Sequence, residues 1–132
     1  MKFSHTSITV RDMDESVRFY TQALGLELER RREIPENRAE IAFVRDPLSG
    51  MRIELTWWTE KKELAEGDQL DHLAFEVPDL DVAMRELQAH GAKVARAPYS
   101  LKGSSNRIAF VNDPNGIWIE LLERPGSATQ GR

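Results

Sequence analysis

The sequence contains no cysteine, which excludes disulfide bonds, thiolate metal ligands and cysteine nucleophiles. It also lacks any run approaching the roughly 20 consecutive apolar residues of a membrane-spanning helix. Its 18 Lys and Arg residues against 22 Asp and Glu residues give a net charge of -4, so neither nucleic acid nor a membrane is an expected partner. The N-terminal residues carry no apolar run typical of a secretory signal, so the cytoplasm is the expected location.

The chain does contain an internal repeat. Its 132 residues, 40% of them hydrophobic, are enough for one globular domain or for two small modules. HTSITVRDMDESVRFYTQALG at 5–25 matches HLAFEVPDLDVAMRELQAHG at 72–91, and IAFVRDPLSGMRIEL at 41–55 matches IAFVNDPNGIWIEL at 108–121. Two matches in the same order predict two copies of one structural unit.

The repeat and the hydrophobic periodicity together predict the domain organisation. Each copy is expected to fold as strand, helix and three strands, so the fold class is α+β with two tandem βαβββ modules. Asp12 and Asp79 are predicted helix N-caps, with Glu15 completing a capping box, and Gly25 and Gly91 follow the helices. The predicted parts are a first module at 1–60, a linker at 61–68, a second module at 69–123 and a disordered tail at 124–132.

One histidine and one glutamate occupy equivalent positions in the two copies. Side chains of a strand alternate between its two faces. His5 and His72 therefore face away from the apolar side chains of the strands at 4–10 and 71–77. Glu54 and Glu120 do the same in the strands at 51–57 and 117–122. Each module is thus predicted to carry one His and one Glu on the face that does not pack on its helix.

These four side chains predict a metal site. A single His or Glu on a strand is more often an ordinary surface residue, but here the pair recurs in both modules. Glu120 also stands in an otherwise apolar run, where a carboxylate is costly unless it is paired or binds a cation. Two neutral imidazoles and two carboxylates balance one divalent ion. Without thiolates the set favours six-coordinate geometry with water, which leaves Zn, Ni, Co, Mn and Fe open.

Longer motifs carry a family resemblance. They are Phe19-Tyr20, Leu24-Gly25-Leu26, Ile53-Glu54-Leu55-Thr56, Asp71-His72-Leu73-Ala74 and Asp113-Pro114-Asn115-Gly116. Over residues 3–123 the chain resembles the vicinal oxygen chelate superfamily, and within it the glyoxalase I (lactoylglutathione lyase) branch. The resemblance implies the glyoxalase/bleomycin-resistance/dioxygenase fold, with curved mixed sheets around a metal site at a homodimer interface. It carries the family's metal ligands onto His5, Glu54, His72 and Glu120, with one divalent ion per site, Ni or Co favoured and Zn or Mn possible.

The resemblance also implies a reaction. The expected substrate is a hemithioacetal of a 2-oxoaldehyde and a thiol, such as methylglyoxal and glutathione, and the expected product is a 2-hydroxyacyl thioester, S-lactoylglutathione. The reaction passes through an enediolate and serves methylglyoxal detoxification. Such chemistry needs a Lewis acid and a base beside the proton that is removed. Glu120 is the predicted base, with Glu54 as its partner, and His5 and Glu54 of one chain are expected to meet His72 and Glu120 of a second.

The thiol-recognition residues depart from the family pattern. Family members that use glutathione often have an Arg at the position of Thr9 and an Asn at the position of Trp58, and some have an Arg at the position of Asp68. Lys102 lies in a Lys-Gly loop that in the family closes over the substrate. Thr9, Trp58, Lys102 and Arg107 are the predicted substrate-binding residues, with Arg107 or Arg52 as a replacement cation.

Two alternatives follow from these departures. The first is a related metalloenzyme, an epimerase, isomerase or dioxygenase, acting on a substrate without glutathione. The second is a non-enzymatic small-molecule or drug-binding resistance protein, although such members of the superfamily typically lack the metal ligands.

Overall fold

The computed structural model describes residues 1–61, 63–65, 67 and 69–126. The chain forms two compact units, Met1–Glu66 and Gly67–Arg132, and the division falls inside the predicted linker. Residues 62, 66 and 68 of that linker lie outside the described residues, as do residues 127–132 of the predicted tail. No helix in the described part of the chain is long and apolar enough to cross a membrane.

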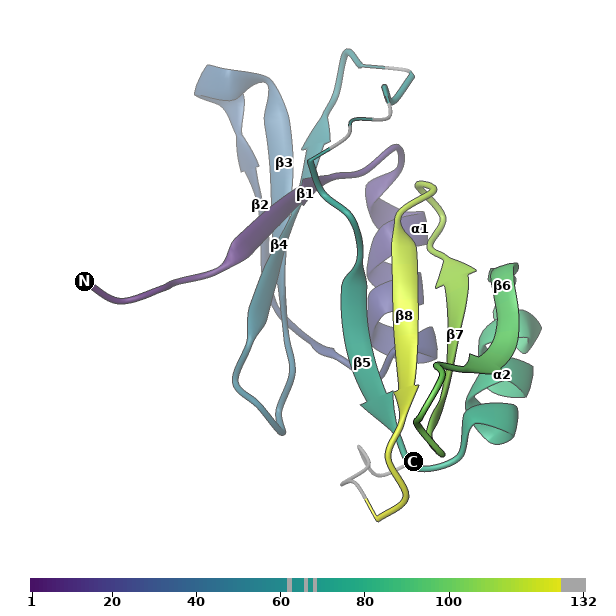
Figure 1. Cartoon of the computed structure of the whole chain (residues 1–132). Coiled ribbons are helices and arrows are strands. Elements are labelled where there is room, and N and C mark those ends of the chain that lie inside the picture. Colours follow the sequence, from purple (N-terminus) through teal and green to yellow (C-terminus); the bar gives the residue numbers. More distant parts are fainter. Residues whose placement is uncertain (62, 66, 68, 127–132) are drawn as a thin grey trace. The chain divides into compact units, whose positions relative to one another are not determined.

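The first unit is a four-stranded mixed sheet with strand order β1-β4-β3-β2 (Figure 1). Its strands are β1 (Thr6–Thr9), β2 (Glu27–Ile34), β3 (Ala39–Arg45) and β4 (Arg52–Trp58). β1 runs parallel to β4, and the other two pairs are antiparallel. A short 3-10 helix, η2 (Pro35–Asn37), turns the chain from β2 into β3. The strands predicted within residues 4–10 and 51–57 are present as β1 and β4.

The first helix contains a feature that the sequence pattern did not predict. α1 (Met13–Arg18) begins at Asp12, whose carboxylate accepts the backbone N–H of Glu15 (2.8 Å). It continues as a π-helical segment, η1 (Phe19–Ala23), in which the N–H of Leu24 donates to the carbonyl of Phe19. The wider turn brings both Phe19 and Tyr20 into the core, whereas an α-helical stripe includes only Tyr20.

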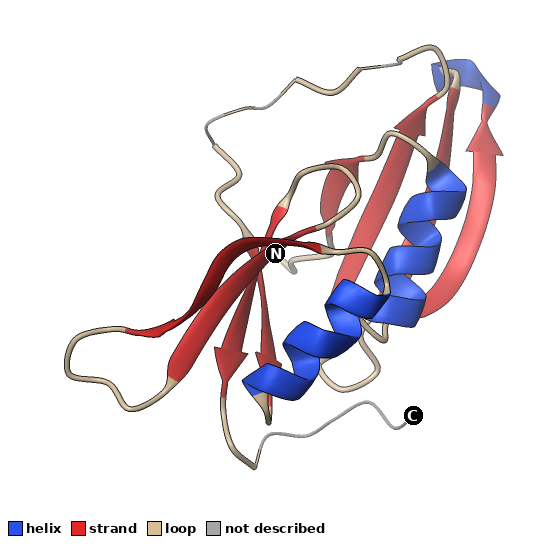
Figure 2. Cartoon of the chain, turned by 90° about the vertical axis from the view of Figure 1, so that its right-hand side faces the viewer, coloured by secondary structure: helices blue, strands red, loops and turns tan. Residues whose placement is uncertain are grey.

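The capping box forms only in part. The Asp12 half is present, but the carboxylate of Glu15 accepts from Arg11 (2.9 Å) instead of returning to the backbone of the cap. α1 contacts β3 and β4, so the helix covers one face of its sheet and leaves the other face open (Figure 2). The buried residues Val10, Met13 and Leu55 fill the space between helix and sheet.

The second unit repeats this arrangement with strand order β5-β8-β7-β6. Its elements are β5 (Leu73–Val77), α2 (Leu80–Ala89), β6 (Lys93–Ser100), β7 (Arg107–Asn112) and β8 (Trp118–Glu123). β5 runs parallel to β8, as β1 does to β4. Asp79 caps α2 by accepting the N–H of Val82 (3.1 Å), and Gly91 follows the helix with a φ of 90°, a backbone conformation that favours glycine. The α+β fold class predicted from the repeat is confirmed.

Candidate active site

The first histidine–glutamate pair lies on the open face of the first sheet. His5 immediately precedes β1, and Glu54 stands on β4 opposite Ser7, two residues further along β1. Residues two apart on a strand share a face, so the side chains of His5 and Glu54 point the same way. His5 Nε2 lies 3.7 Å from Glu54 Oε1. The strand register therefore brings together one imidazole and one carboxylate.

The second pair repeats the first. His72 immediately precedes β5, and Glu120 stands on β8 opposite Ala74. His72 Nε2 lies 3.2 Å from Glu120 Oε1. The predicted equivalence of the two copies therefore extends to the distance between the side chains.

An aromatic ring holds each imidazole in place. Phe43 on β3 pairs with Glu54, and the ring of His5 meets Phe43 edge to face with centroids 4.9 Å apart. Phe110 on β7 pairs with Glu120, and its ring meets His72 at 5.6 Å in the same way. Such edge-to-face contacts restrict rotation of the imidazoles. Each pair is therefore fixed from the next strand of its own sheet.

The other nitrogen of each imidazole is also engaged. The Nδ1–H of His72 donates to Asp71 Oδ1 (2.6 Å), because a carboxylate is an acceptor only. Ser4 Oγ lies 2.8 Å from Nδ1 of His5. With Nδ1 carrying the proton, a neutral His72 turns the lone pair of Nε2 toward Glu120. Metal-bound histidines show this arrangement, in which an outer carboxylate or hydroxyl fixes the tautomer.

Among the described residues, neither glutamate of the two pairs forms an ion pair with a Lys or Arg. The side chains of Glu54 and Glu120 are only 20% and 16% exposed, and the basic side chain beside each is its own histidine. A neutral imidazole does not balance the charge of a partly buried carboxylate, so both residues retain the capacity to bind a cation. No group of three or more His, Asp or Glu side chains among the described residues could hold a metal by itself. Each pair by itself therefore offers two candidate metal ligands.

A pocket of about 480 Å³ covers the open face of the first unit. His5 and Glu54 line it, together with the predicted substrate-binding residues Thr9 and Trp58. Its remaining lining residues are Ser7, Arg30, Arg32, Ile34, Asn37, Ala39, Ile41, Phe43 and Thr56. The structure therefore brings two of the four predicted substrate-binding residues beside the first histidine–glutamate pair.

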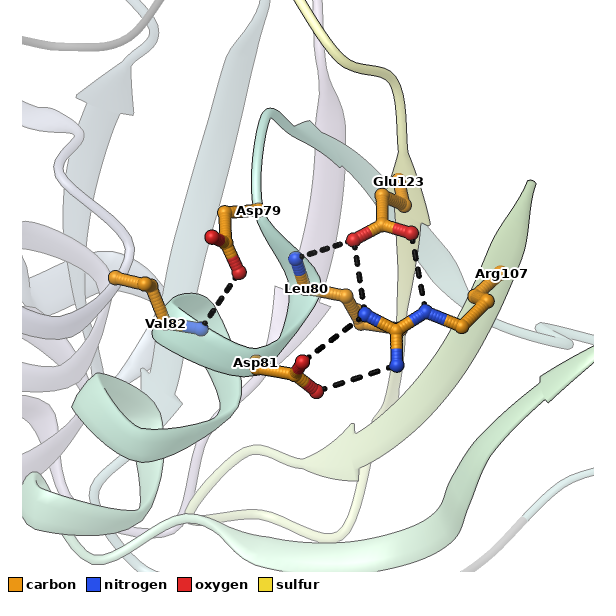
Figure 3. A network of polar contacts seen from close by, with 6 residues as sticks. All are labelled: Asp79, Leu80, Asp81, Val82, Arg107 and Glu123. Carbon is orange, nitrogen blue, oxygen red and sulfur yellow. Dashed lines mark hydrogen bonds and ion pairs between the residues drawn. The ribbon is translucent and has the colours of Figure 1, made fainter.

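Arg107 does not join this group. It stands on β7, and its guanidinium donates to both oxygens of Glu123 (3.1 Å each) and to Asp81 at the start of α2 (Figure 3). The hydrogen bonds to Glu123 and then to Asp81 raise the pKa of Arg107 further above its ordinary value. Arg107 therefore lies on the helix face of the second sheet, away from His72, and we withdraw it as a replacement cation.

Lys102 and Arg52 occupy different surroundings. Lys102 is exposed in the turn between β6 and β7. Arg52 lies over the ring of Phe43, with its guanidinium carbon 4.3 Å from the ring centroid, and it donates to Glu29 (2.8 Å). The sequence reasoning missed Asp71, Ser4 and Phe43 as supports of the pairs. The sequence feature that could have indicated Ser4 and Asp71 is that each immediately precedes one of the two histidines.

Comparisons with known proteins agree with this architecture. The model of the Glyoxalase/Bleomycin resistance protein/Dioxygenase superfamily matches residues 2–121. A lactoylglutathione lyase of Haemophilus influenzae is 39% identical, with 93% of each chain covered. A probable lactoylglutathione lyase of Vibrio cholerae is 37% identical, covering 90% of this chain and 88% of that protein.

Two solved structures are similar as well. Glyoxalase I from Zea mays matches with a TM-score of 0.83 and 29% identity, over 93% of this chain, which spans 44% of the maize chain. The trypanothione-dependent glyoxalase I of Leishmania major matches with a TM-score of 0.74 and 30% identity, over 90% of this chain and 84% of that chain.

Proposed function

The chain belongs to the Glyoxalase/Bleomycin resistance protein/Dioxygenase superfamily, and from this premise we propose that it is a metal-dependent glyoxalase I. It is an enzyme of the lactoylglutathione lyase type, as its bacterial relatives over most of the chain indicate. The proposed substrate is the hemithioacetal of methylglyoxal and a thiol, and the proposed product is the 2-hydroxyacyl thioester. The observation that carries the proposal is the pair of matched His–Glu contacts, His5–Glu54 and His72–Glu120.

The donor set fits a divalent cation. His5 and His72 supply nitrogen through Nε2, and Glu54 and Glu120 supply oxygen. Such ligands suit borderline ions such as Ni, Co or Zn, and also Mn. When bound, the ion acts as a Lewis acid on the oxygen atoms of the substrate and stabilises the negative charge that develops there. Elemental analysis, followed by reconstitution with each of these metals, identifies the physiological ion; we favour Ni or Co.

The chain's own groups move the proton. Glu120 removes it from the carbon that carries sulfur, and the proton returns to the neighbouring carbon, so the reaction is redox-neutral. Glu54 faces the substrate as the partner carboxylate. Glu120 suits this role because the described residues place no Lys or Arg against it, so its oxygen atoms remain available to accept a proton.

The complete site requires that both pairs meet. We place His5 and Glu54 of one subunit with His72 and Glu120 of a second, so a homodimer contains two shared sites. Oligomers with twofold symmetry form such sites in equivalent pairs. The support is that each pair alone offers two ligands, which is too few for a catalytic metal site.

Glu120→Gln tests the proposal. The amide keeps the shape of the side chain but cannot accept the proton, so kcat is expected to fall by about 10²–10⁴ while circular dichroism stays unchanged. Metal content is measured on the same sample to separate the loss of the base from the loss of a ligand. Glu33→Gln, which neutralises an exposed glutamate of β2 outside the pocket, is the matched control. Wild-type turnover in Glu120→Gln would exclude Glu120 as the base.

A second candidate is the same chemistry on another thiol. Thr9 and Trp58 line the pocket where the family pattern expects Arg and Asn, and the Leishmania relative is trypanothione-dependent by its name. Comparing kcat/KM for hemithioacetals of glutathione and of other thiols separates the two candidates. Saturable turnover with glutathione and none with the others would eliminate the second.

A further inference from the structure

Two arginines on β2 line the pocket beside the first His–Glu pair. Arg30, Arg31 and Arg32 follow one another in the strand, so alternate residues face opposite sides of the sheet. Arg31 faces the helix side and binds Asp14 (2.7 Å) and Glu40 (3.0 Å). Arg30 and Arg32 are both exposed and both line the pocket.

Neither pocket arginine has an acidic partner. In residues 1–61, Arg11, Arg31, Arg38 and Arg52 each form an ion pair with a glutamate. Arg30 has no ion pair within the described chain and instead lies over the ring of Phe43, 4.8 Å from its centroid. Arg32 has no hydrogen-bond or ion-pair partner among the described residues. The pocket therefore contains two guanidinium groups that form no ion pair with any described residue. Guanidinium is the side-chain group best suited to bidentate binding of a carboxylate.

We propose that Arg30 and Arg32 form a carboxylate-binding subsite for the thiol part of the substrate. This inference rests on the proposed function and assigns recognition of the thiol to two arginines of β2. Family members that use glutathione often have an Arg at the position of Thr9 instead. Along the sheet, Arg30 pairs with Phe43, and Phe43 pairs with Glu54. Two strand spacings of ~4.8 Å therefore separate the backbone of Arg30 from that of Glu54, a distance of about 10 Å. A tripeptide thiol, which spans about 10 Å when extended, can reach from one to the other.

The second unit lacks an equivalent subsite. Arg96 on β6 pairs with Phe110, as Arg30 pairs with Phe43. Tyr99, however, pairs with Ile108 where Arg32 pairs with Ile41, and the guanidinium of Arg96 stacks on Tyr99 at 3.8 Å. Among the described residues, the second unit therefore has Tyr99 where the first unit has the second pocket arginine, Arg32.

The experiment measures binding of a non-reacting ligand, so it does not depend on turnover. S-methylglutathione and its diethyl ester, which lacks the carboxylate charges, are titrated calorimetrically into the full chain and into R30Q, R32Q and R31Q. S-methylglutathione is expected to bind about tenfold more weakly to R30Q and to R32Q, because each loses a charged hydrogen bond. The diethyl ester is expected to bind all four proteins equally, and R31Q, which removes the same charge from the helix face, is expected to bind like the wild type.

The outcomes separate the subsite from the reaction. If R30Q and R32Q bind S-methylglutathione as tightly as the wild type does, the proposed subsite is wrong, even if the enzyme turns over the hemithioacetal. Arginine-dependent binding supports the subsite, even if no hemithioacetal is turned over, in which case only the proposed reaction fails. Coenzyme A, a thiol that carries phosphate groups, is titrated in the same way. If R30Q and R32Q bind coenzyme A more weakly but bind S-methylglutathione like the wild type, the subsite selects phosphate and the carboxylate assignment is wrong. In an active enzyme, R32Q is expected to raise KM for the glutathione hemithioacetal about tenfold and to leave kcat unchanged.

Discussion

At the scale of single residues, the two histidines differ in the group behind the ring. His72 donates from Nδ1 to the carboxylate of Asp71, whereas His5 lies against the hydroxyl of Ser4. A carboxylate fixes the orientation of the imidazole more strongly than a hydroxyl does. Asp71 is itself largely exposed, which limits the effect.

The Asp71→Asn variant is therefore expected to bind the metal more weakly, by about tenfold, at the low end of the range for outer partners of metal ligands. Ser4→Ala is its counterpart in the first unit and is expected to have a smaller effect. A competition titration against a chromophoric chelator at fixed pH measures both. Equal affinity for the wild type and Asp71→Asn would show that Asp71 does not support the site.

The alternation of side chains along a β-strand explains for which residues the sequence could predict the face of the sheet. His5 and Glu54 were predicted on one face because alternation fixes the face of each strand residue, and the structure confirms their shared face. The same rule applied to Arg107, three positions before Phe110, places it on the opposite face, where the structure has it. The contact of Asp71 with His72 depends on a side-chain rotamer. That Arg32 forms no ion pair with a described residue depends on which acidic side chains lie within its reach. The two-residue alternation of a β-strand predicts neither of these features.

At the scale of secondary structure, Glu123 connects the end of β8 to the start of α2. Its carboxylate accepts from Arg107 and from the backbone N–H of Leu80 (2.9 Å), the first residue of the helix (Figure 3). These hydrogen bonds, the one from Arg107 foremost, hold the pKa of Glu123 below its ordinary value of 4.5. The ionised form is therefore the one that stabilises the fold.

This depressed pKa predicts a pH dependence of stability. The contribution of Glu123 is fully present above about pH 4.5 and is lost as the pH falls through the lower pKa of the folded state. Glu123→Gln is expected to unfold at a lower temperature than the wild type at pH 7, with the difference shrinking toward pH 3. Thermal unfolding followed by circular dichroism across this range measures it. A difference that stays constant with pH would mean that the ionised carboxylate contributes nothing.

The π-helical segment shows where the sequence pattern was insufficient at this scale. Met13, Val17, Tyr20 and Leu24 predict an α-helical stripe, and the helix follows it as far as Arg18. Beyond that residue the helix widens into a π-helical segment in which the adjacent Phe19 and Tyr20 are both buried, and the hydroxyl of Thr21 donates to the carbonyl of Val17 (2.7 Å). A period of 3.6 residues does not represent this wider turn.

At the scale of the whole molecule, each of the two units contains one His–Glu pair, and the proposed function requires that four such ligands meet. If one chain completed its own site, Glu54 and Glu120 of that chain would serve the same metal ion. If two chains share their sites, Glu54 of one serves with Glu120 of the other. Mixing inactive variants distinguishes these arrangements, because only shared sites allow one variant to complement another.

Glu54→Gln and Glu120→Gln are each expected to be inactive, and a mixture of the two, unfolded and refolded together, is expected to recover activity. In a mixed dimer one site carries both substitutions and the other carries none. With random pairing, half of the dimers are mixed and each has one intact site, so about a quarter of wild-type activity should return. Each variant refolded alone is the control. If the mixture stays inactive while an affinity tag carried by only one variant co-purifies the other, each chain completes its own site.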